Sequence, residues 1–455
     1  MEFMNLGRDV EIGANSYWIR SKNRSVILDV GMHPKREGLD ATPDFSRVPD
    51  GSVSSIIVTH SHQDHVGGLP LLTRREPKAK VFMTAATARI ADVMLHNSVN
   101  VMLRQKEERG LEPLFTHRGV ELSRAAWQPC RFGKPHDFNG ERTEFDDGDS
   151  FEFLPAGHIL GAAGVRMRLD GRTIFYTGDV NFENQTLIRG ADFPEDGVDV
   201  LIMEATRGDS PTPTGFSRAK EEERLAEAIR ESFARGAAVT IPVFALGKTQ
   251  EVLGMIWKMR MRGDLPQNPL YVGGLSTKLT MIYDQFMGDI QRQHQELSLL
   301  QELAPYVLAG NDVSTTAVRK RCLYAISSGM MTEHTVSNIF ARKVIGDPNQ
   351  SLFFVGYSDP DSPAGKIRAA SPGDSISLDA NHPPIPLRCD VKEFNFSAHA
   401  SRESLLNYAV ALRPQKILLV HGDRPAIEWF HMKLYRELPE TEVIIPEPGK
   451  KISLS

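Results

Sequence analysis

The sequence HSHQDH at residues 60–65 constrains this chain more than any other of its features. It directly follows the apolar run at 54–59 and precedes a pair of glycines, which places it in a turn after a predicted strand. Four of its side chains can bind metals: His60, His62, Asp64 and His65. Such a turn can spread them so that two histidines bind one ion while the Asp and the next His bind a second. The segment therefore predicts a metal centre at the carboxyl end of a strand, where α/β sheets bind ligands.

The rest of the chain fits an α/β fold, because short apolar or β-branched runs alternate with amphipathic stretches. Strands are predicted at 25–31, 54–60, 80–85, 150–158, 164–171, 172–179, 198–205, 237–245, 323–329, 351–357 and 416–423. Helices are predicted at 215–236, between an N-cap at Ser217 and a stop at Gly236, and at 249–263. The segment 357–366, rich in Pro, Gly, Ser and Asp, predicts a long loop.

Further metal ligands are expected because one such cluster is too small to hold two ions. His158, Asp179 and His421 each stand at the end of a predicted strand. The two oxygens of Asp179 suit it to bridge two cations. Asp29 also ends a predicted strand, and a carboxylate behind a ligating imidazole commonly orients that ring. These positions predict a site that holds two metal ions.

A second pair of residues suits proton transfer. Glu204 ends the predicted strand at 198–205, and His399 lies in the sequence FNFSAHAS at 394–401. A buried Glu beside a His would hold the imidazole in one tautomer and raise its pKa, which suits a general acid.

Composition limits the partners and the compartment of the chain. With Lys+Arg 53 and Asp+Glu 58, the formal charge is −5, so no overall positive field attracts nucleic acid, and a polyanionic substrate needs local cations or bound metal. The three cysteines, Cys130, Cys322 and Cys389, are widely spaced and odd in number, which favours a reducing compartment. The polar N-terminus and the absence of a long apolar run predict a cytoplasmic protein without a membrane partner.

Taken in order, several motifs resemble one family. They are THSHQDHVGGLP (59–70), PAGHILGAA (155–163), YTGDVN (176–181), the strand ending in Glu204, FSAHAS (396–401) and LVHGD (419–423). Together they resemble the metallo-β-lactamase fold nucleases of the β-CASP family. Within it, the sequence is most similar to the nuclease subunit of the cleavage and polyadenylation specificity factor and its bacterial and archaeal ribonuclease relatives. The motifs ALGKTQE (245–251) and SSGM (327–330) resemble the inserted domain of that family.

The resemblance implies an αββα metallo-β-lactamase core over residues 1–205, an inserted α/β β-CASP domain over 206–393, and completion of the core by 394–455. It assigns His60, His62 and His158 to one zinc ion and Asp64, His65 and His421 to another, with Asp179 as the bridge. Asp64, Asp179, Glu204 and His399 form the implied catalytic set. Lys248, Ser328, Gly329 and Lys366 lie in motifs of the inserted domain and are the expected substrate-binding residues.

The implied activity is hydrolysis of RNA phosphodiester bonds by two zinc ions, with single-stranded RNA as the expected substrate. A DNA-directed nuclease, a metallo-hydrolase of a thioester, lactam or lactone, and a catalytically silent scaffold are the alternatives. The sequence does not decide between endonuclease and 5′ exonuclease action, and it leaves open whether the protein forms a homo-oligomer. One departure from the family is Arg207, in EATRG, where relatives usually have an aromatic residue.

Overall fold

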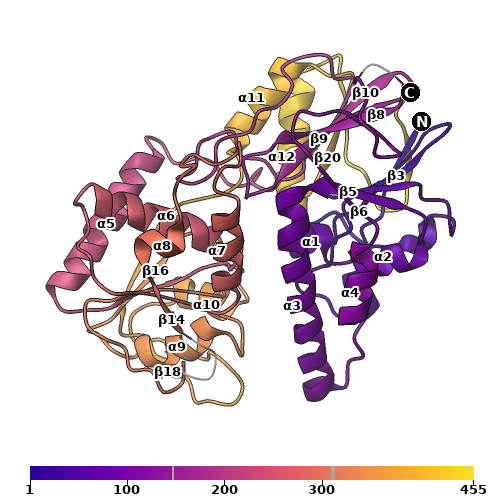
Figure 1. Ribbon diagram of the computed structural model, residues 1–455. Helices are drawn as coiled ribbons and strands as arrows, with labels where there is room; N and C mark the ends of the chain where they lie inside the picture. Colours follow the sequence, from indigo (N-terminus) through magenta and orange to yellow (C-terminus); the bar gives the residue numbers. More distant parts are fainter. Residues whose placement is uncertain (146–147, 309–312) are drawn as a thin grey trace. The chain divides into compact units, whose positions relative to one another are not determined.

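The computed structural model describes residues 1–145, 148–308 and 313–455 (Figure 1). The chain forms two compact units. Unit 1 contains residues 1–184, 188–212 and 399–455, and unit 2 contains residues 185–187 and 213–398. Apart from the short segment 185–187, the chain passes into unit 2 after residue 212 and returns to unit 1 at residue 399. The domain boundaries at 205 and 393 remain predictions.

Two mixed sheets form the centre of unit 1. The first has the order β22 (Lys451–Ser453), β1 (Glu2–Asn5), β2 (Tyr17–Arg20), β3 (Ser25–Leu28), β4 (Ser55–Ile57), β5 (Lys80–Thr84) and β6 (Trp127–Cys130). The second has the order β21 (Glu442–Ile444), β20 (Lys416–Val420), β11 (Val200–Glu204), β10 (Arg172–Tyr176), β9 (Ala163–Leu169), β8 (Ser150–Pro155) and β7 (His136–Asp137). Strands β3 to β6 are parallel to one another, and so are β10, β11, β20 and β21.

Helices cover the outer faces of both sheets. Beside the first sheet lie α1 (Gln63–Val66), α2 (Leu69–Arg75), α3 (Ala85–Arg109) and α4 (His117–Arg124), and beside the second lie α11 (Arg402–Leu412) and α12 (Arg424–Glu437). Figure 1 shows α11 and α12 side by side, in yellow. Among the described residues, no helix combines the length and apolar composition needed to cross a membrane.

Alternation along the strands explains these layers, because successive side chains of a strand point to opposite faces. Ile57 of β4 packs between the sheets in one hydrophobic cluster with Phe151 and Val165 of the second sheet. Its neighbour Ile56 packs on the outer face with Leu95 of α3. On the far side, Leu419 of β20 shares a cluster with residues of α11 and α12. The order helix, sheet, sheet, helix is the predicted αββα arrangement.

Unit 2 is built on a parallel sheet. Its order is β14 (Tyr306–Leu308), β13 (Leu270–Gly273), β15 (Leu323–Ile326), β12 (Val239–Pro242), β16 (Ser351–Phe354) and β19 (Asp390–Glu393). A short pair, β17 (Ser375–Ile376) and β18 (Ile385–Pro386), lies apart from it. The helices are α5 (Arg218–Ala234), α6 (Lys248–Met261), α7 (Leu275–Gln285), α8 (Leu299–Leu303), α9 (Val336–Val344) and α10 (Pro363–Ala369).

Helix ends in unit 2 follow local chemistry. Ser217 accepts a hydrogen bond from the Lys220 amide at 3.3 Å and so begins α5, and the left-handed backbone of Gly236 (φ 82°) follows its end, as predicted. The prediction of a continuous loop over 357–366 was wrong at its end, where α10 begins. Ser362 caps this helix by accepting a bond from the Gly365 amide at 3.1 Å, and Pro363 occupies its first turn, where a missing N–H costs nothing.

Candidate metal centre

The predicted metal ligands of unit 1 and the orienting residue Asp29 lie beyond strand ends, and the predicted catalytic residue Glu204 is the last residue of β11. Asp29 follows β3, His60 to His65 follow β4, His158 follows β8, Asp179 follows β10, and His421 directly follows β20. Asp64 and His65 lie on the short helix α1, whose backbone is tied to the neighbouring loop by bonds from the Val30 amide to the His65 carbonyl and from the Asn15 amide to the Asp64 carbonyl. The loops after these strands therefore bring residues far apart in sequence to one place.

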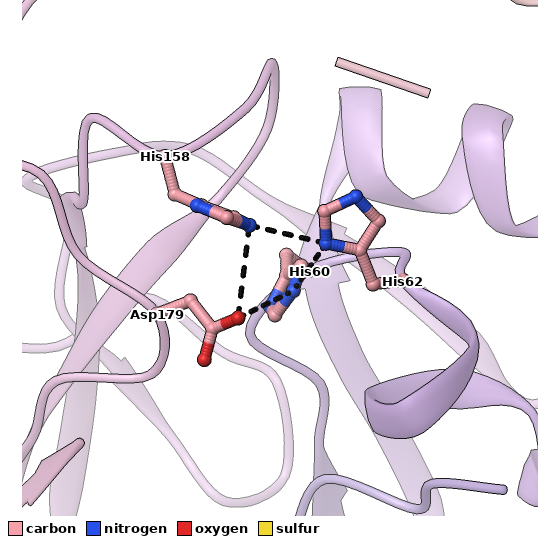
Figure 2. A group of neighbouring side chains, drawn as sticks. All are labelled: His60, His62, His158 and Asp179. Atoms are coloured by element: carbon pink, nitrogen blue, oxygen red, sulfur yellow. Dashed lines mark hydrogen bonds and ion pairs between the residues drawn. The ribbon is translucent and has the colours of Figure 1, made fainter. Parts of the chain in front are cut away.

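Three histidines and one carboxylate form the first ligand group (Figure 2). The His62 Nδ1 atom lies 3.2 Å from His60 Nε2 and 3.1 Å from His158 Nε2. The Asp179 Oδ2 atom lies 3.5 Å from His60 Nε2 and 3.6 Å from His158 Nε2. Four potential ligand atoms therefore converge on one point.

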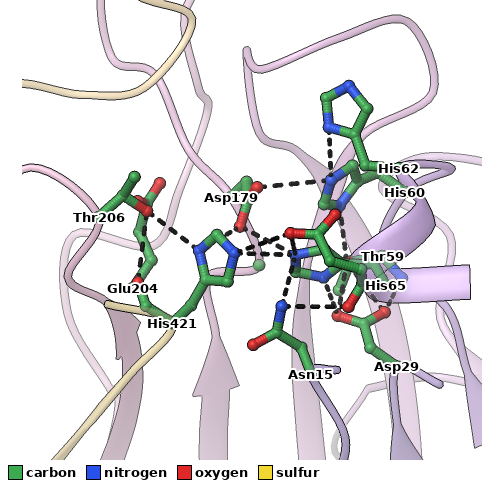
Figure 3. A network of polar contacts seen from close by, with 12 residues as sticks. Asn15, Asp29, Thr59, His60, His62, His65, Asp179, Glu204, Thr206 and His421 are labelled. Carbon is green, nitrogen blue, oxygen red and sulfur yellow. Dashed lines mark hydrogen bonds and ion pairs between the residues drawn. The ribbon is translucent and has the colours of Figure 1, made fainter. Parts of the chain in front are cut away.

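The second group consists of Asp64, His65 and His421. Figure 3 shows its two histidines beside Asp179. The His421 Nε2 atom lies 3.3 Å from Asp64 Oδ2 and 3.4 Å from His65 Nε2. The other oxygen of Asp179, Oδ1, lies 3.3 Å from His65 Nε2. Asp179 thus directs one oxygen toward each group, which is the arrangement that a bridging ligand requires.

These distances fit metal ions. A tetrahedral ion with Zn–N bonds of about 2.0 to 2.1 Å separates its ligand atoms by about 3.3 Å. Asp179 Oδ1 is buried and accepts no hydrogen bond from the described part of the chain, although two imidazoles approach it. A buried carboxylate oxygen without such a bond is costly unless a cation satisfies it. The donor set, imidazole nitrogens with carboxylate oxygens, is the one that zinc takes in hydrolytic sites.

The electrostatics of the cluster favour the metal-binding protonation state at three of its residues, His60, His62 and Asp64. Burial, together with the charge of His65, lowers the pKa of His60 well below its usual value, and burial also lowers the pKa of His62. Burial alone would raise the pKa of Asp64, but His65 and His421 lower it to about 2. Neutral imidazoles at His60 and His62 and an ionised carboxylate at Asp64 are therefore available together. Burial alone would lower the pKa of His65, but Asp179 and Asp29 raise it well above its usual value, so His65 has to release a proton when a metal ion binds.

Asp29 holds one of the imidazoles from behind. Its Oδ2 atom lies 2.8 Å from His65 Nδ1 and accepts a hydrogen bond from the Tyr176 hydroxyl at 2.8 Å, and its Oδ1 atom accepts one from the Thr59 amide at 2.7 Å. Asp29 is completely buried. With a proton on Nδ1, His65 presents the lone pair of Nε2 to the second group.

The backbone around the centre is unusual at several positions. Asp29 (φ 57°) and His421 (φ 47°) both adopt the left-handed conformation, which costs about 1 to 3 kcal/mol outside glycine and is common at functional sites. Gly157 precedes His158 and has φ 73°, and a Cβ atom there would lie 2.2 Å from the Asn181 carbonyl oxygen. Only glycine lets the two loops approach this closely.

Glu204 and His399 form a separate pair beside the metal ligands. Glu204 Oε1 accepts a hydrogen bond from the Val180 amide at 2.6 Å, and the His399 Nδ1 atom lies 3.2 Å from both Glu204 oxygens. Burial alone would lower the pKa of His399, but the Glu204 carboxylate raises it above its usual value. The His399 Nε2 atom lies 4.0 Å from Asp179 Oδ2, so the ring stands next to the first ligand group.

The predicted substrate-binding residues lie in unit 2. Lys248 begins α6, and its ammonium donates to the Phe396 carbonyl. A small pocket is lined by Lys248 and Gly329 together with Phe244, Gly356 and Tyr357. Ser328 is next to Gly329, and its carbonyl accepts a bond from the Ser337 hydroxyl at 2.6 Å. Lys366 is exposed on α10. Two of the four residues therefore share one pocket.

Sequence reasoning missed four polar neighbours of the centre, namely Asn15, Thr59, Tyr176 and Thr206 (Figure 3 labels three of them). Asn15 Nδ2 lies 3.3 Å from His65 Nε2, and Thr206 Oγ1 lies 3.0 Å from His421 Nδ1. Thr59 directly precedes the HSHQDH segment, and Thr206 follows Glu204 by two residues. These positions in the sequence could have indicated both residues. Asn15 lies in an N-terminal loop without any motif.

Three family models match the chain. They describe the metallo-beta-lactamase superfamily (residues 10–230), the Beta-Casp domain (249–367) and a Zn-dependent metallo-hydrolase RNA specificity domain (384–446). A solved structure of a protein of unknown function from Enterococcus faecalis matches with a TM-score of 0.59 and 14% identity over 99% of both chains, which supports the fold alone.

Curated relatives agree with these models. The chain is 28% identical over 430 residues to an RNase J-like protein of Methanocaldococcus jannaschii, with 94% of each chain covered. It is 27% identical to the endoribonuclease ysh1 of Schizosaccharomyces pombe and to the cleavage and polyadenylation specificity factor 73 of Drosophila melanogaster, over 93% and 96% of this chain. It spans only 54% and 62% of the length of those two proteins. The chain therefore belongs to the metallo-β-lactamase superfamily, in the β-CASP family of metal-dependent ribonucleases.

Proposed function

We propose that this chain hydrolyses phosphodiester bonds of RNA with two zinc ions. The observation that carries the proposal is the pair of ligand groups that share Asp179, one oxygen toward each. His60, His62 and His158 would hold one ion, and Asp64, His65 and His421 the other. When bound, such ions would act as Lewis acids that offset the charge on phosphoryl oxygens. They would also lower the pKa of water, so that hydroxide is available as the nucleophile near neutral pH.

The residues of the chain supply orientation and a proton. Asp29 fixes the tautomer of His65, and Glu204 fixes that of His399, because each carboxylate lies against an Nδ1 atom. His399 then holds a proton on Nε2, on the side of Asp179, and donates it to the departing 3′ oxygen. The product on the other side of the break carries a 5′ phosphate.

Two findings support RNA as the substrate. The RNA specificity domain model covers residues 384–446, which include His399 and His421. The matched relatives from Methanocaldococcus jannaschii and Schizosaccharomyces pombe are described as RNase J-like and as an endoribonuclease. We further propose that Lys248, Ser328, Gly329 and Lys366 contact a single strand.

One experiment tests the proposal. Zinc content is measured by elemental analysis, and the zinc-loaded protein is incubated with RNA and DNA oligonucleotides labelled at the 5′ or the 3′ end. We expect about two zinc ions per chain and cleavage of RNA, with product lengths that distinguish internal cuts from stepwise 5′ removal. A stoichiometry near zero in folded protein would refute the assignment of the site, and cleavage of lactams or thioesters without any oligonucleotide cleavage would refute the assignment of the substrate.

Compartment and assembly also remain proposals. The three cysteines are free and buried, which supports a reducing, cytoplasmic environment. Sedimentation of the purified protein would show whether it forms a homo-oligomer.

A further inference from the structure

Arg207 is a basic residue close in sequence to Glu204, the carboxylate that contacts His399. It lies in the turn after β11, three residues beyond Glu204 and next to Thr206, which bonds to His421. The turn is fixed at both ends: the Ala205 amide bonds to the His421 carbonyl at 3.1 Å, and a Cβ atom at Gly208 would lie 2.1 Å from the Ala426 carbonyl oxygen. The backbone of Arg207 is therefore held in place relative to His421.

The guanidinium of Arg207 has no partner among the described residues. The side chain is half-buried, yet no carboxylate lies within 4.0 Å of it and it donates no hydrogen bond. Every other half-buried arginine in the described part of unit 1 has a partner, as with Arg36 and Glu11 at 2.6 Å or Arg47 and Asp44 at 3.0 Å. A half-buried cation that forms no bond within the protein has its donors available for an anionic ligand.

Three carboxylates lie close enough to Arg207 to act on its charge. Glu403, Glu204 and Glu183 all act electrostatically on Arg207, and burial lowers the pKa of Arg207 against their effect. Glu403 is already bound to the Thr212 hydroxyl at 2.8 Å and to Arg402 at 3.1 Å, and Glu204 is bound to His399. Asp179, Glu204 and His399 of the candidate site belong to the same unit of the chain. Without Arg207, the negative charge of these carboxylates would oppose the approach of a phosphate chain.

We infer that Arg207 binds a backbone phosphate of the RNA strand on the side of the metal centre where His399 stands. The planar guanidinium suits a phosphate because it can donate two parallel hydrogen bonds to its oxygens. It also offsets the charge of the neighbouring carboxylates. The contact would hold the strand with its departing 3′ oxygen toward His399. This inference rests on the proposed function, since it names a contact for the same substrate.

The test compares Arg207→Ala, Arg207→Lys and a matched control, Arg118→Ala. Arg118 is an exposed arginine of α4 in the same unit and pairs with Glu121 at 3.1 Å. For each protein, KM and kcat for a labelled RNA are measured over a range of KCl concentrations, together with zinc content and melting temperature. Wild-type protein is measured first, because the absence of RNA cleavage there would overturn the proposed function and this inference with it.

With active wild-type protein, we expect Arg207→Ala to raise KM about 10- to 100-fold, the effect of a lost charge-assisted hydrogen bond. The slope of log KM against log salt should fall by about 0.7, the value for one phosphate contact on a single strand. Arg207→Lys should keep the slope with an intermediate KM, and Arg118→Ala should match wild type. An unchanged KM and slope in Arg207→Ala, or equal losses of zinc and melting temperature in both Arg207 variants, would overturn the inference.

Discussion

Both oxygens of the Glu204 carboxylate lie 3.2 Å from His399 Nδ1, and the opposite nitrogen of that ring lies 4.0 Å from Asp179. The imidazole is therefore held by a carboxylate on one side and stands beside the ligand group on the other. Since Glu204 engages Nδ1, only Nε2 is available to give a proton to a substrate. This relationship separates His399 from the histidines whose nitrogens converge on the two ligand groups.

His399→Ala should lose most turnover while it keeps its metals. Loss of a general acid typically costs about 10²- to 10⁴-fold in rate, and the residue is not among the ligands of either histidine-rich group. RNA cleavage and zinc content are measured on the same sample. Glu204→Gln should cause a smaller loss, because the amide still occupies the place beside Nδ1.

His421→Ala is the matched comparison for His399→Ala. The His421 Nε2 atom lies 3.3 Å from Asp64 and 3.4 Å from His65, so this variant should lose close to one zinc ion per chain. If the two variants lost zinc to the same extent, the distinction between proton donor and ligand would be wrong.

Asp29→Asn should weaken metal binding without unfolding the chain. Asp29 lies behind His65 Nδ1 at 2.8 Å, and loss of such an orienting carboxylate typically costs about 10- to 100-fold in metal affinity. Competition with a chromophoric chelator measures this change. Tyr176→Phe removes only the 2.8 Å hydroxyl bond to the same carboxylate, and we expect a smaller effect from it. Equal zinc affinity in wild type and Asp29→Asn would refute the orienting role.

The convergence of the predicted ligands could be predicted because these residues stand at strand ends. The carboxyl ends of neighbouring strands meet at one edge, so His158, Asp179 and His421 could be placed near residues 60–65 from the apolar runs before them. The strands themselves end earlier than predicted: β4 stops at Ile57, and the ligands lie in the segment that follows it. A run of hydrophobic residues indicates where the chain is buried, and the chain stays buried beyond the end of the strand. The run therefore overestimates the length of the strand.

Other features depend on contacts that a single sequence does not carry. The long helix α3 was not predicted, because its first half, with Ile90 and Leu95, is buried while its last residues are charged and exposed. The left-handed backbone of Asp29 and His421 follows from the loops packed around them rather than from residue preference. The bond from Asn15 to His65 crosses 50 positions in the sequence and has no local signature.

Gly157→Ala should destabilise unit 1 and weaken the metal centre. A Cβ atom at this position would lie 2.2 Å from the Asn181 carbonyl oxygen, so the loops that carry His158 and Asp179 would have to separate. Gly171→Ala is the matched control, because Gly171 also has a left-handed backbone (φ 79°) but no atom lies near its Cβ position. The control should cost about 1 to 2 kcal/mol in the free energy of unfolding, and Gly157→Ala clearly more. Denaturant unfolding and zinc titration measure both effects, and similar values for the two variants would contradict the role of the close approach.

The contribution of Lys248 to RNA binding should disappear as the pH rises. Burial, together with the nearby charge of Arg218, lowers the pKa of Lys248 to about 8. A lysine is cationic below its pKa, so Lys248 would attract phosphate at pH 7 and lose about nine-tenths of its charge at pH 9. We expect Lys248→Ala to weaken RNA binding about 10-fold at pH 7 and about 2-fold at pH 9.

Fluorescence anisotropy measures this binding in the His399→Ala background, where the RNA stays intact. Lys366→Ala is the comparison, because Lys366 is the other lysine predicted to bind substrate and it is exposed on α10. An effect of Lys248→Ala that does not change between pH 7 and pH 9 would instead assign the residue to its bond with the Phe396 carbonyl and remove it from the RNA-binding surface. The pH dependence thus separates a phosphate contact from a structural role, because only the former requires the positive charge.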